Sequence, residues 1–212
     1  FEETIQIKDY LFRYNRGAFW AGKLVCKRFY IPFNKFFRII NSPIFRTKTL
    51  YKLLHLTNIS QDYVIQDISL PKNNILKFLD YTNKNLKIYP LWICPIKPSR
   101  TERLSPSFIQ TDLILNVGVW GEIIGNTSNY LSINRDIETK TAELGGRKIL
   151  YAHSYYSEKE FWKIYDKTWY DTLRKKYYAT EIFPTVYEKI SVKNVYKKSV
   201  IKGLLRFIFE RF

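Results

Sequence analysis

Two apolar stretches, residues 88–98 and 113–122, constrain the fold of this protein most strongly. The first is rich in β-prone residues but contains Pro90, Pro95 and Pro98. Because proline has no amide donor for a β-ladder, this stretch must lie at a sheet edge, carry a bulge or leave the sheet at the prolines. The second is a β-branched run that ends in glycines, which allow a tight turn or a close approach to a ligand. The two stretches therefore predict adjoining strands whose ends form one wall of a pocket.

Strand-like and helix-like patterns alternate around these two stretches. The predicted elements are, in sequence order, a strand (62–71), an amphipathic helix (73–86), two strands (87–96 and 111–119), a helix (133–144) and a short strand (148–153). This βαββαβ order is typical of an antiparallel sheet with two helices on one face. The remainder is predicted to be helical, with one helix from the capping-box signature Ser157–Glu160 through Trp169 and another starting at Pro184. The predicted fold class is α+β.

Composition divides the sequence into three predicted regions: a basic, aromatic-rich segment (1–60), a central domain (61–193) and a basic amphipathic tail helix (194–212). No Asp or Glu occurs between Tyr10 and Gln61. Aromatic residues interleaved with cations suit either single-stranded nucleic acid or a membrane interface. The competing interpretation is that the aromatic residues fill a core and the cations coat it. The tail helix suits a membrane surface or docking on another domain.

The formal net charge is +16, which favours an anionic partner unless A/T-rich codons account for the abundant lysine. The sequence begins with Phe1 and has no methionine, which predicts a piece of a longer protein. Its two isolated cysteines, Cys26 and Cys94, are predicted to be free thiols rather than zinc ligands or a disulfide. No apolar run approaches the ~20 residues that a membrane-spanning helix needs.

The short motifs of complete nucleotide sites do not occur in this sequence: there is no G-x-G-x-x-G, P-loop or nucleophile elbow. Candidate site residues lie instead at the ends of the predicted strands. Tyr151 and His153 can donate or accept protons. The other candidates are Trp92, Cys94, Trp120, Glu122, Tyr155 and Tyr156. For each of them a purely structural role, such as core packing, is the competing interpretation.

Eight short motifs resemble, in the same order, the C-terminal part of the Δ24-sterol reductase (seladin-type) family of FAD-linked oxidoreductases. They are residues 11–20, 41–46, 64–67, 89–95, 118–122, 150–156, 160–162 and 183–189. The resemblance extends to about Lys193, so the tail lies beyond it. Animal members of the family carry an acid where Asn116 stands and another near His153, so proton donation or substrate choice can differ in this protein.

The resemblance implies the cap, or substrate, domain of a vanillyl-alcohol-oxidase-type flavoprotein, with an N-terminal FAD-binding domain preceding Phe1. Such enzymes reduce a C=C bond in the side chain of a sterol, with NADPH as the electron source, on endoplasmic reticulum membranes. The implied partners are a sterol, the FAD-binding domain and a membrane surface, with no specific nucleic acid. In this interpretation Tyr151 and His153 are catalytic, and Asn116 and Gly118 contact the cofactor. The substrate contacts are Trp92, Cys94, Trp120, Glu122, Tyr155 and Tyr156.

Two other functions stay open from the sequence. One is the cap region of a related FAD-linked oxidase that acts on a sugar, lactone or alcohol. The other is a non-catalytic basic module that binds a membrane or nucleic acid.

Overall fold

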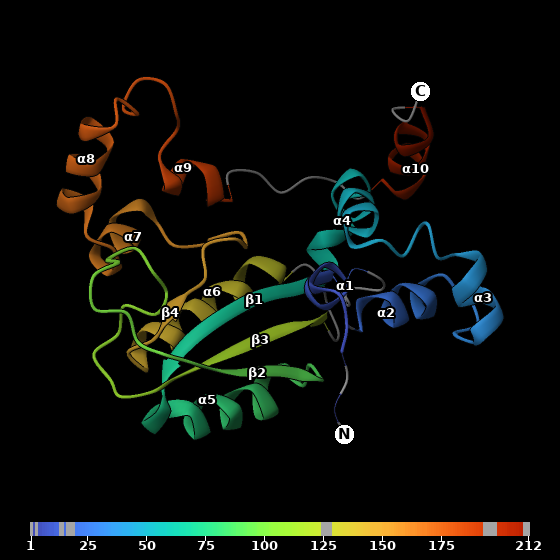
Figure 1. Ribbon diagram of the computed structural model, residues 1–212, viewed down its shortest axis with the longest axis horizontal. Helices are drawn as coiled ribbons and strands as arrows, with labels where there is room; N and C mark the ends of the chain where they lie inside the picture. The colour runs from blue at the N-terminus through green and yellow to red at the C-terminus, as the bar shows by residue number, and fades with distance from the viewer. Residues whose placement is uncertain are drawn as a thin grey trace. The chain divides into compact units, whose positions relative to one another are not determined.

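The computed structural model describes residues 2, 4–12, 15, 20–123, 129–192 and 199–209. The protein forms two compact units, shown as a ribbon in Figure 1. The first unit comprises Phe1–Ser60 and Tyr196–Phe212, and the second comprises Gln61–Val195. The predicted boundary between residues 193 and 194 lies outside the described residues.

The second unit contains a four-stranded antiparallel sheet with the spatial order β2-β3-β1-β4 (Figure 1). Its strands are β1 (Tyr63–Pro71), β2 (Leu91–Ile96), β3 (Ile114–Glu122) and β4 (Arg147–Lys148). Along the sequence, helix α5 (Ile75–Tyr81), continued by a π-helical turn (Thr82–Leu86), connects β1 to β2. Helix α6 (Tyr130–Glu143) comes after β3 and before β4. The predicted α+β class with an antiparallel sheet is confirmed. Strand β2 contains Pro95 and lies at an edge, where one side of a strand needs no ladder donors.

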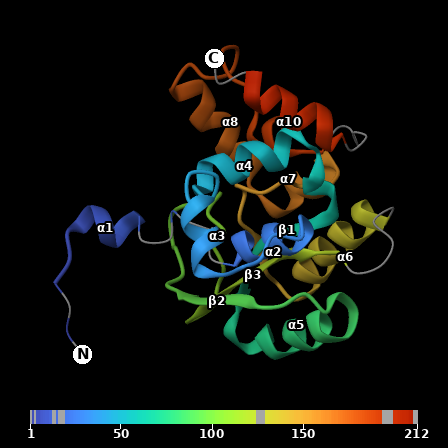
Figure 2. The same ribbon diagram turned by 90° about the vertical axis from the view of Figure 1, so that its right-hand side faces the viewer.

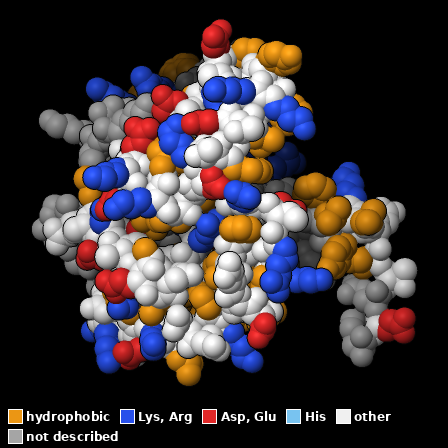
Figure 3. Space-filling model, turned by 90° about the vertical axis from the view of Figure 1, so that its left-hand side faces the viewer, with side chains coloured by type: hydrophobic (Ala, Val, Ile, Leu, Met, Phe, Trp, Pro, Cys, Tyr) orange, Lys and Arg blue, Asp and Glu red, His pale blue; other side chains and the backbone are white. Residues whose placement is uncertain are grey.

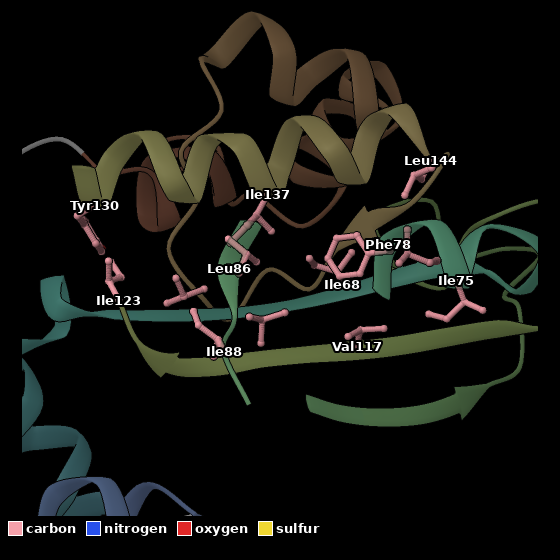
Figure 4. Packing of buried hydrophobic residues seen from close by; sticks show 13 residues of the cluster. Ile68, Ile75, Phe78, Leu86, Ile88, Val117, Ile123, Tyr130, Ile137 and Leu144 are labelled. Atoms are coloured by element: carbon pink, nitrogen blue, oxygen red, sulfur yellow. The ribbon is translucent and has the colours of Figure 1, made fainter. Parts of the chain in front are cut away.

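The main core lies between the sheet and the two helices α5 and α6. Alternate residues of β1, such as Ile68 and Leu70, are almost fully buried, as the period of a strand requires. Figure 4 shows Ile68 and Val117 from the strands facing Phe78 and Ile137 from the helices. Burying each such side chain stabilises the fold by about 1.5–3 kcal/mol.

The predicted strand over 148–153 is wrong for most of its length, because β4 ends at Lys148. The Ile149 amide still donates to the Asp67 carbonyl at 2.8 Å, but residues 150–152 turn away from the sheet. The ammonium of Lys148 donates to the carbonyl of His153, which folds this segment back on itself. A buried ammonium group is costly unless it is hydrogen-bonded, and its bond to the His153 carbonyl outweighs the β-propensity of the segment.

The helix predicted from Ser157 through Trp169 is interrupted. It forms as α7 (Glu158–Ile164) and α8 (Lys167–Lys176), and the carboxylate of Asp166 caps α8 by accepting from the Trp169 amide at 2.8 Å. The predicted capping box of α7 is present. Helix α9 (Val186–Ile190) begins after Pro184, with a second capping box. These helices enclose a second cluster built on Tyr156, Phe161, Tyr165 and Ile190.

The first unit is helical. Its helices are α1 (Ile7–Phe12), α2 (Ala21–Arg28), α3 (Lys35–Ile40), α4 (Thr47–Leu56) and α10 (Val200–Phe209). Helices α4 and α10 lie side by side in Figures 1 and 2. They approach closely at Gly203, where an added Cβ would lie 2.5 Å from the Leu56 carbonyl oxygen. None of the described helices is long and apolar enough to span a membrane.

Candidate functional site

The sheet face opposite α5 and α6 brings polar and aromatic side chains of three strands together. In the β-ladder register, Asp67 of β1 pairs with Gly118 of β3, and Gly118 pairs with Trp92 of β2. Paired residues of an antiparallel ladder share a face, so neighbouring rows add further members. We call this surface the Asp67 face; it consists of Ile65, Asp67, Ser69, Trp92, Cys94, Asn116, Gly118 and Trp120.

Gly118 allows two side chains to close over the backbone of β3. A Cβ at this position would lie 2.5 Å from Asp67 Oδ1 and 3.1 Å from the Cβ of Trp92. Any larger residue would therefore displace the carboxylate. Glycine at this point of a strand marks a close approach, and it sets the depth at which Asp67 sits.

Asp67 is only 6% exposed, although it carries a carboxylate. The Tyr151 hydroxyl donates a hydrogen bond to its Oδ2 at 2.6 Å. Burial raises the pKa of Asp67, and hydrogen bonds from Tyr151, Trp120 and Asn116 offset only part of that effect. The site therefore holds a carboxyl group that keeps its proton more readily than an exposed one.

Two hydrogen bonds to backbone groups, one on each side of Tyr151, hold the segment that carries this residue. Before Tyr151, the Ile149 amide is bonded to the Asp67 carbonyl at 2.8 Å. After it, the His153 carbonyl accepts from the ammonium of Lys148. Because both ends are attached to the sheet, the phenol is placed over Asp67 although Tyr151 is 54% exposed.

A buried ion pair supports this segment from the opposite side of the sheet. Lys148 Nζ and Glu138 Oε1 lie 2.8 Å apart, and each side chain is 1% exposed. Glu138 Oε1 also accepts from the Tyr155 amide at 2.9 Å. Burial raises the pKa of Glu138 and lowers that of Lys148, while their mutual attraction opposes both shifts. The pair ties α6 to β4 and to the segment that follows it.

The structure brings together most of the sequence-predicted site residues. Trp92, Cys94, Asn116, Gly118 and Trp120 share the Asp67 face. Tyr151 joins them through its hydrogen bond to Asp67. Glu122 lies at the end of β3, in register with Tyr63. Both cysteines of the protein are free.

Two of the predicted residues, Tyr155 and Tyr156, lie elsewhere. Tyr155 packs against the core cluster on the helix side, with its hydroxyl bonded to that of Tyr130. Tyr156 is buried in the second cluster and donates to the Glu138 carbonyl at 3.2 Å. His153 is exposed. Roles for Tyr155 and Tyr156 as direct substrate contacts therefore have no support from their position.

Asp67 is the central residue that the sequence did not single out. The signal was present, because Asp67 is an acid within an otherwise largely apolar strand, between Ile65 and Ser69 on one face. What the alternation could not show was its burial, or that residue 151 would reach it from 84 positions away.

The residues of the Asp67 face fit one edge of a flavin ring better than a whole dinucleotide. A carboxylate can accept from polar ring atoms and an amide can both accept and donate, whereas the space directly over Gly118 is taken by Asp67 and Trp92. A pyrophosphate needs backbone amides at a glycine-rich turn or a helix N-terminus, which this face does not provide among its described residues. Among those residues, no group of three or more His, Cys, Asp or Glu is placed to hold a metal.

The fold and site together define an α+β domain with a buried carboxyl group that is hydrogen-bonded to an exposed tyrosine, on the sheet face opposite its helices. The sequence is 30% identical to the human Delta(24)-sterol reductase in an alignment 202 residues long, which covers 89% of this protein and 37% of that one. It is 25% identical to a Delta(24)-sterol reductase homolog of Caenorhabditis elegans and 28% identical to the Delta(24)-sterol reductase of Pisum sativum. Both matches span 89% of this protein, and they span 36% and 37% of those relatives.

These matches confirm the predicted resemblance to the Δ24-sterol reductase family, whose named members are oxidoreductases. The chain spans a little over a third of the length of these relatives. No protein-family profile matches the sequence, and no solved structure matches it significantly.

Proposed function

We propose that this protein is the C-terminal, substrate-binding part of a FAD-dependent oxidoreductase that reduces the Δ24 double bond of a sterol. The observation that carries the proposal is the similarity to Delta(24)-sterol reductases from animals and plants over 89% of the sequence. In this proposal the FAD-binding domain lies outside residues 1–212, which agrees with the missing phosphate-binding motifs. The second unit would be the cap domain of a vanillyl-alcohol-oxidase-type flavoprotein.

The Asp67 face supplies groups suited to such a reaction. Trp92 and Trp120 offer apolar surface for the aliphatic tail of a sterol, while Asn116 and Gly118 would lie toward the flavin ring. FAD, reduced by NADPH, would supply the hydride. The residues of the Asp67 face then orient the C=C bond and exclude water, and Tyr151, whose hydroxyl reaches Asp67, delivers a proton.

The test begins with the coding sequence upstream of Phe1, which should encode a FAD-binding domain. The complete protein, which joins that domain to residues 1–212, should bind flavin and convert a sterol with a Δ24 double bond to its saturated product only when NADPH is present. A saturated sterol is the matched control and should be unchanged. Oxygen consumption driven by a sugar, lactone or alcohol without NADPH would instead assign the protein to the flavoprotein oxidases.

We also propose that the first unit contacts a membrane surface, of the endoplasmic reticulum in the proposed enzyme. It contains 16 Lys or Arg and 4 Asp or Glu, so its net charge of +12 makes up most of the +16 of the protein. Large apolar side chains on its helices are exposed as well, namely Ile7 (77%), Leu11 (66%), Phe36 (65%), Ile39 (64%), Ile201 (76%) and Phe209 (73%). Exposed apolar groups among cations favour an anionic lipid interface.

Charge on the rest of the protein is balanced by comparison. The second unit holds 19 Lys or Arg and 15 Asp or Glu. On the face shown in Figure 3, basic side chains are interspersed with acidic ones. The high net charge of the protein therefore belongs mainly to one unit, as expected of a local docking surface and not of a genome-wide codon bias.

Flotation with anionic liposomes tests the membrane proposal. Each basic residue near an anionic surface contributes about 1 kcal/mol, so reversing three charges should weaken binding by about a hundredfold or more. The variant of the first unit is K27E/K35E/K48E, and the matched control in the second unit is K77E/K175E/K176E, all at exposed lysines. Equal loss in both variants, or equal binding to neutral liposomes, would contradict a specific surface.

A further inference from the structure

The geometry around Asp67 points to more than a single proton donor. Tyr151 is the outer member of the pair, at 54% exposure, and Asp67 is the inner member, at 6%. The phenol hydroxyl is directed at Asp67 Oδ2 across 2.6 Å. While Asp67 is ionised, the phenol proton is engaged with its carboxylate. When Asp67 is protonated, its own O–H can donate to the phenol oxygen across the same contact, and the phenol proton is then free to turn toward a substrate.

We propose that Asp67 and Tyr151 form a proton relay, in which protonated Asp67 replaces the proton that Tyr151 gives to the sterol. This role rests on the proposed function and assigns the positioning residue of the same site. Asp67 does not need to touch the substrate, which agrees with its place beneath Tyr151 and beside Gly118.

The relay solves a problem of acid strength. An isolated C=C bond is a weak base, and a phenol acting alone would leave behind a phenolate, which is far more basic than a carboxylate. When Asp67 reprotonates the phenol oxygen in the same step, the charge that remains is a carboxylate. The Tyr151 hydroxyl then delivers its proton with the driving force of a carboxylic acid.

The reaction balances in atoms and electrons. One alkene carbon receives a hydride from reduced flavin, which NADPH has reduced. The other carbon forms a C–H bond with the Tyr151 hydroxyl proton as the Tyr151 O–H bond breaks. The Asp67 proton moves to the Tyr151 oxygen and leaves a carboxylate, which regains a proton from water after the product has left.

Several groups face Asp67 and set its protonation. Strand β3 contributes Asn116 and Trp120, and β2 contributes Trp92, with the titratable Cys94 one row away. The segment after β4 contributes the titratable Tyr151. Hydrogen bonds from three of these groups favour the carboxylate, yet burial outweighs them and raises the pKa of Asp67. The inner group can therefore hold a proton at a pH where exposed aspartates have lost theirs.

The first arm of the test uses the 212-residue protein itself and needs no cofactor. With ¹³C-labelled aspartate, NMR follows each carboxyl carbon against pH, and the signal absent from D67N belongs to Asp67. We expect its midpoint above the ordinary value of about 3.9, and higher again in Y151F, which removes a hydrogen bond that favours the carboxylate. A midpoint at or below the ordinary value overturns the relay.

The second arm uses the complete protein, with its proposed FAD-binding domain and bound flavin. D67N keeps an oxygen that accepts from Tyr151 but has no acidic proton to transfer. We therefore expect kcat to fall by about a hundredfold or more, as in Y151F. Because the two residues act as one unit, D67N/Y151F should be little worse than either single variant. The pH profile of wild-type kcat should lose its high-pH limb in D67N.

The outcomes separate the two proposals. An active wild-type protein whose D67N variant keeps near-normal turnover overturns the relay alone. A flavin-loaded wild-type protein that reduces no sterol overturns the proposed function, and the role of the relay with it.

Discussion

The buried ion pair between Glu138 and Lys148 gives the sharpest prediction on stability. Replacing Lys148 with Met keeps most of the volume but leaves a carboxylate that is 1% exposed without the ammonium 2.8 Å away. Breaking a buried pair in this way costs about 3–5 kcal/mol. The variant E138Q should cost a similar amount, because it leaves the ammonium charge unpaired.

The double variant E138Q/K148M should be far more stable than the sum of the single losses. It contains no buried charge at this position, and its main remaining defect is the His153 carbonyl without the donor that Lys148 provided. One unpaired buried group costs about 1–3 kcal/mol. We therefore expect a coupling of about 3 kcal/mol or more between Glu138 and Lys148 from urea unfolding followed by tryptophan fluorescence.

The surface pair Lys84–Asp80 is the matched control. Its atoms are also 2.8 Å apart, but its side chains are 69% and 57% exposed. Such pairs contribute about 0–1 kcal/mol, so K84M should be nearly neutral. If K148M costs no more than K84M, or if the coupling is below about 0.5 kcal/mol, the buried pair does not stabilise this fold as argued.

Acid provides an independent check on the same pair. The pKa of Glu138 is already raised by burial, and removing Lys148 raises it further. A carboxyl group with a raised folded-state pKa destabilises the fold when it is ionised, and this penalty disappears as pH falls through that pKa. The deficit of K148M should therefore be smaller at about pH 5 than at about pH 8. A deficit that grows on acidification would refute the reasoning.

Three further predictions concern close contacts and a cap. G118A places a Cβ 2.5 Å from Asp67 Oδ1 and should cost about 1–3 kcal/mol in urea unfolding. G203A places a Cβ 2.5 Å from the last carbonyl oxygen of α4 and should speed hydrogen exchange in α10. E160Q should cost about 0.5 kcal/mol at neutral pH. Because Arg135 and Ser157 lower the pKa of Glu160 to about 2, its contribution is present above about 4.5 and lost as pH falls toward 2.

Each of these variants has its own control. D67A removes the carboxylate oxygen that the new Cβ of G118A would contact. The double variant D67A/G118A should therefore lose less stability than the sum of the losses in D67A and G118A. I201A lies on the exposed side of α10, at 76% exposure, and should leave exchange in that helix unchanged. A pH-independent loss in E160Q would show that packing, and not charge, is responsible.

The resemblance motifs and the alternation of apolar residues were enough to predict the α+β class and most members of the Asp67 face. Trp92 and Trp120 were found because strand patterns are local and the prolines and glycines mark the strand ends, whereas Asn116 and Gly118 were named under the family resemblance. The prediction of a strand over residues 148–153 was wrong because a tertiary contact, and not a local pattern, decides the path of this segment. The β-prone segment turns away because the Lys148 ammonium, buried beside Glu138, takes the His153 carbonyl as an acceptor.

The sequence alone determined which residues face together within each strand, since a period of two is a property of the local backbone. Only the tertiary structure decided which strands are neighbours and which groups lose their water. Asp67 became a proton-holding group through burial and was joined to Tyr151 by a hydrogen bond, two consequences of packing between distant segments. Local patterns do not encode desolvation, and the chemistry of this site depends on it.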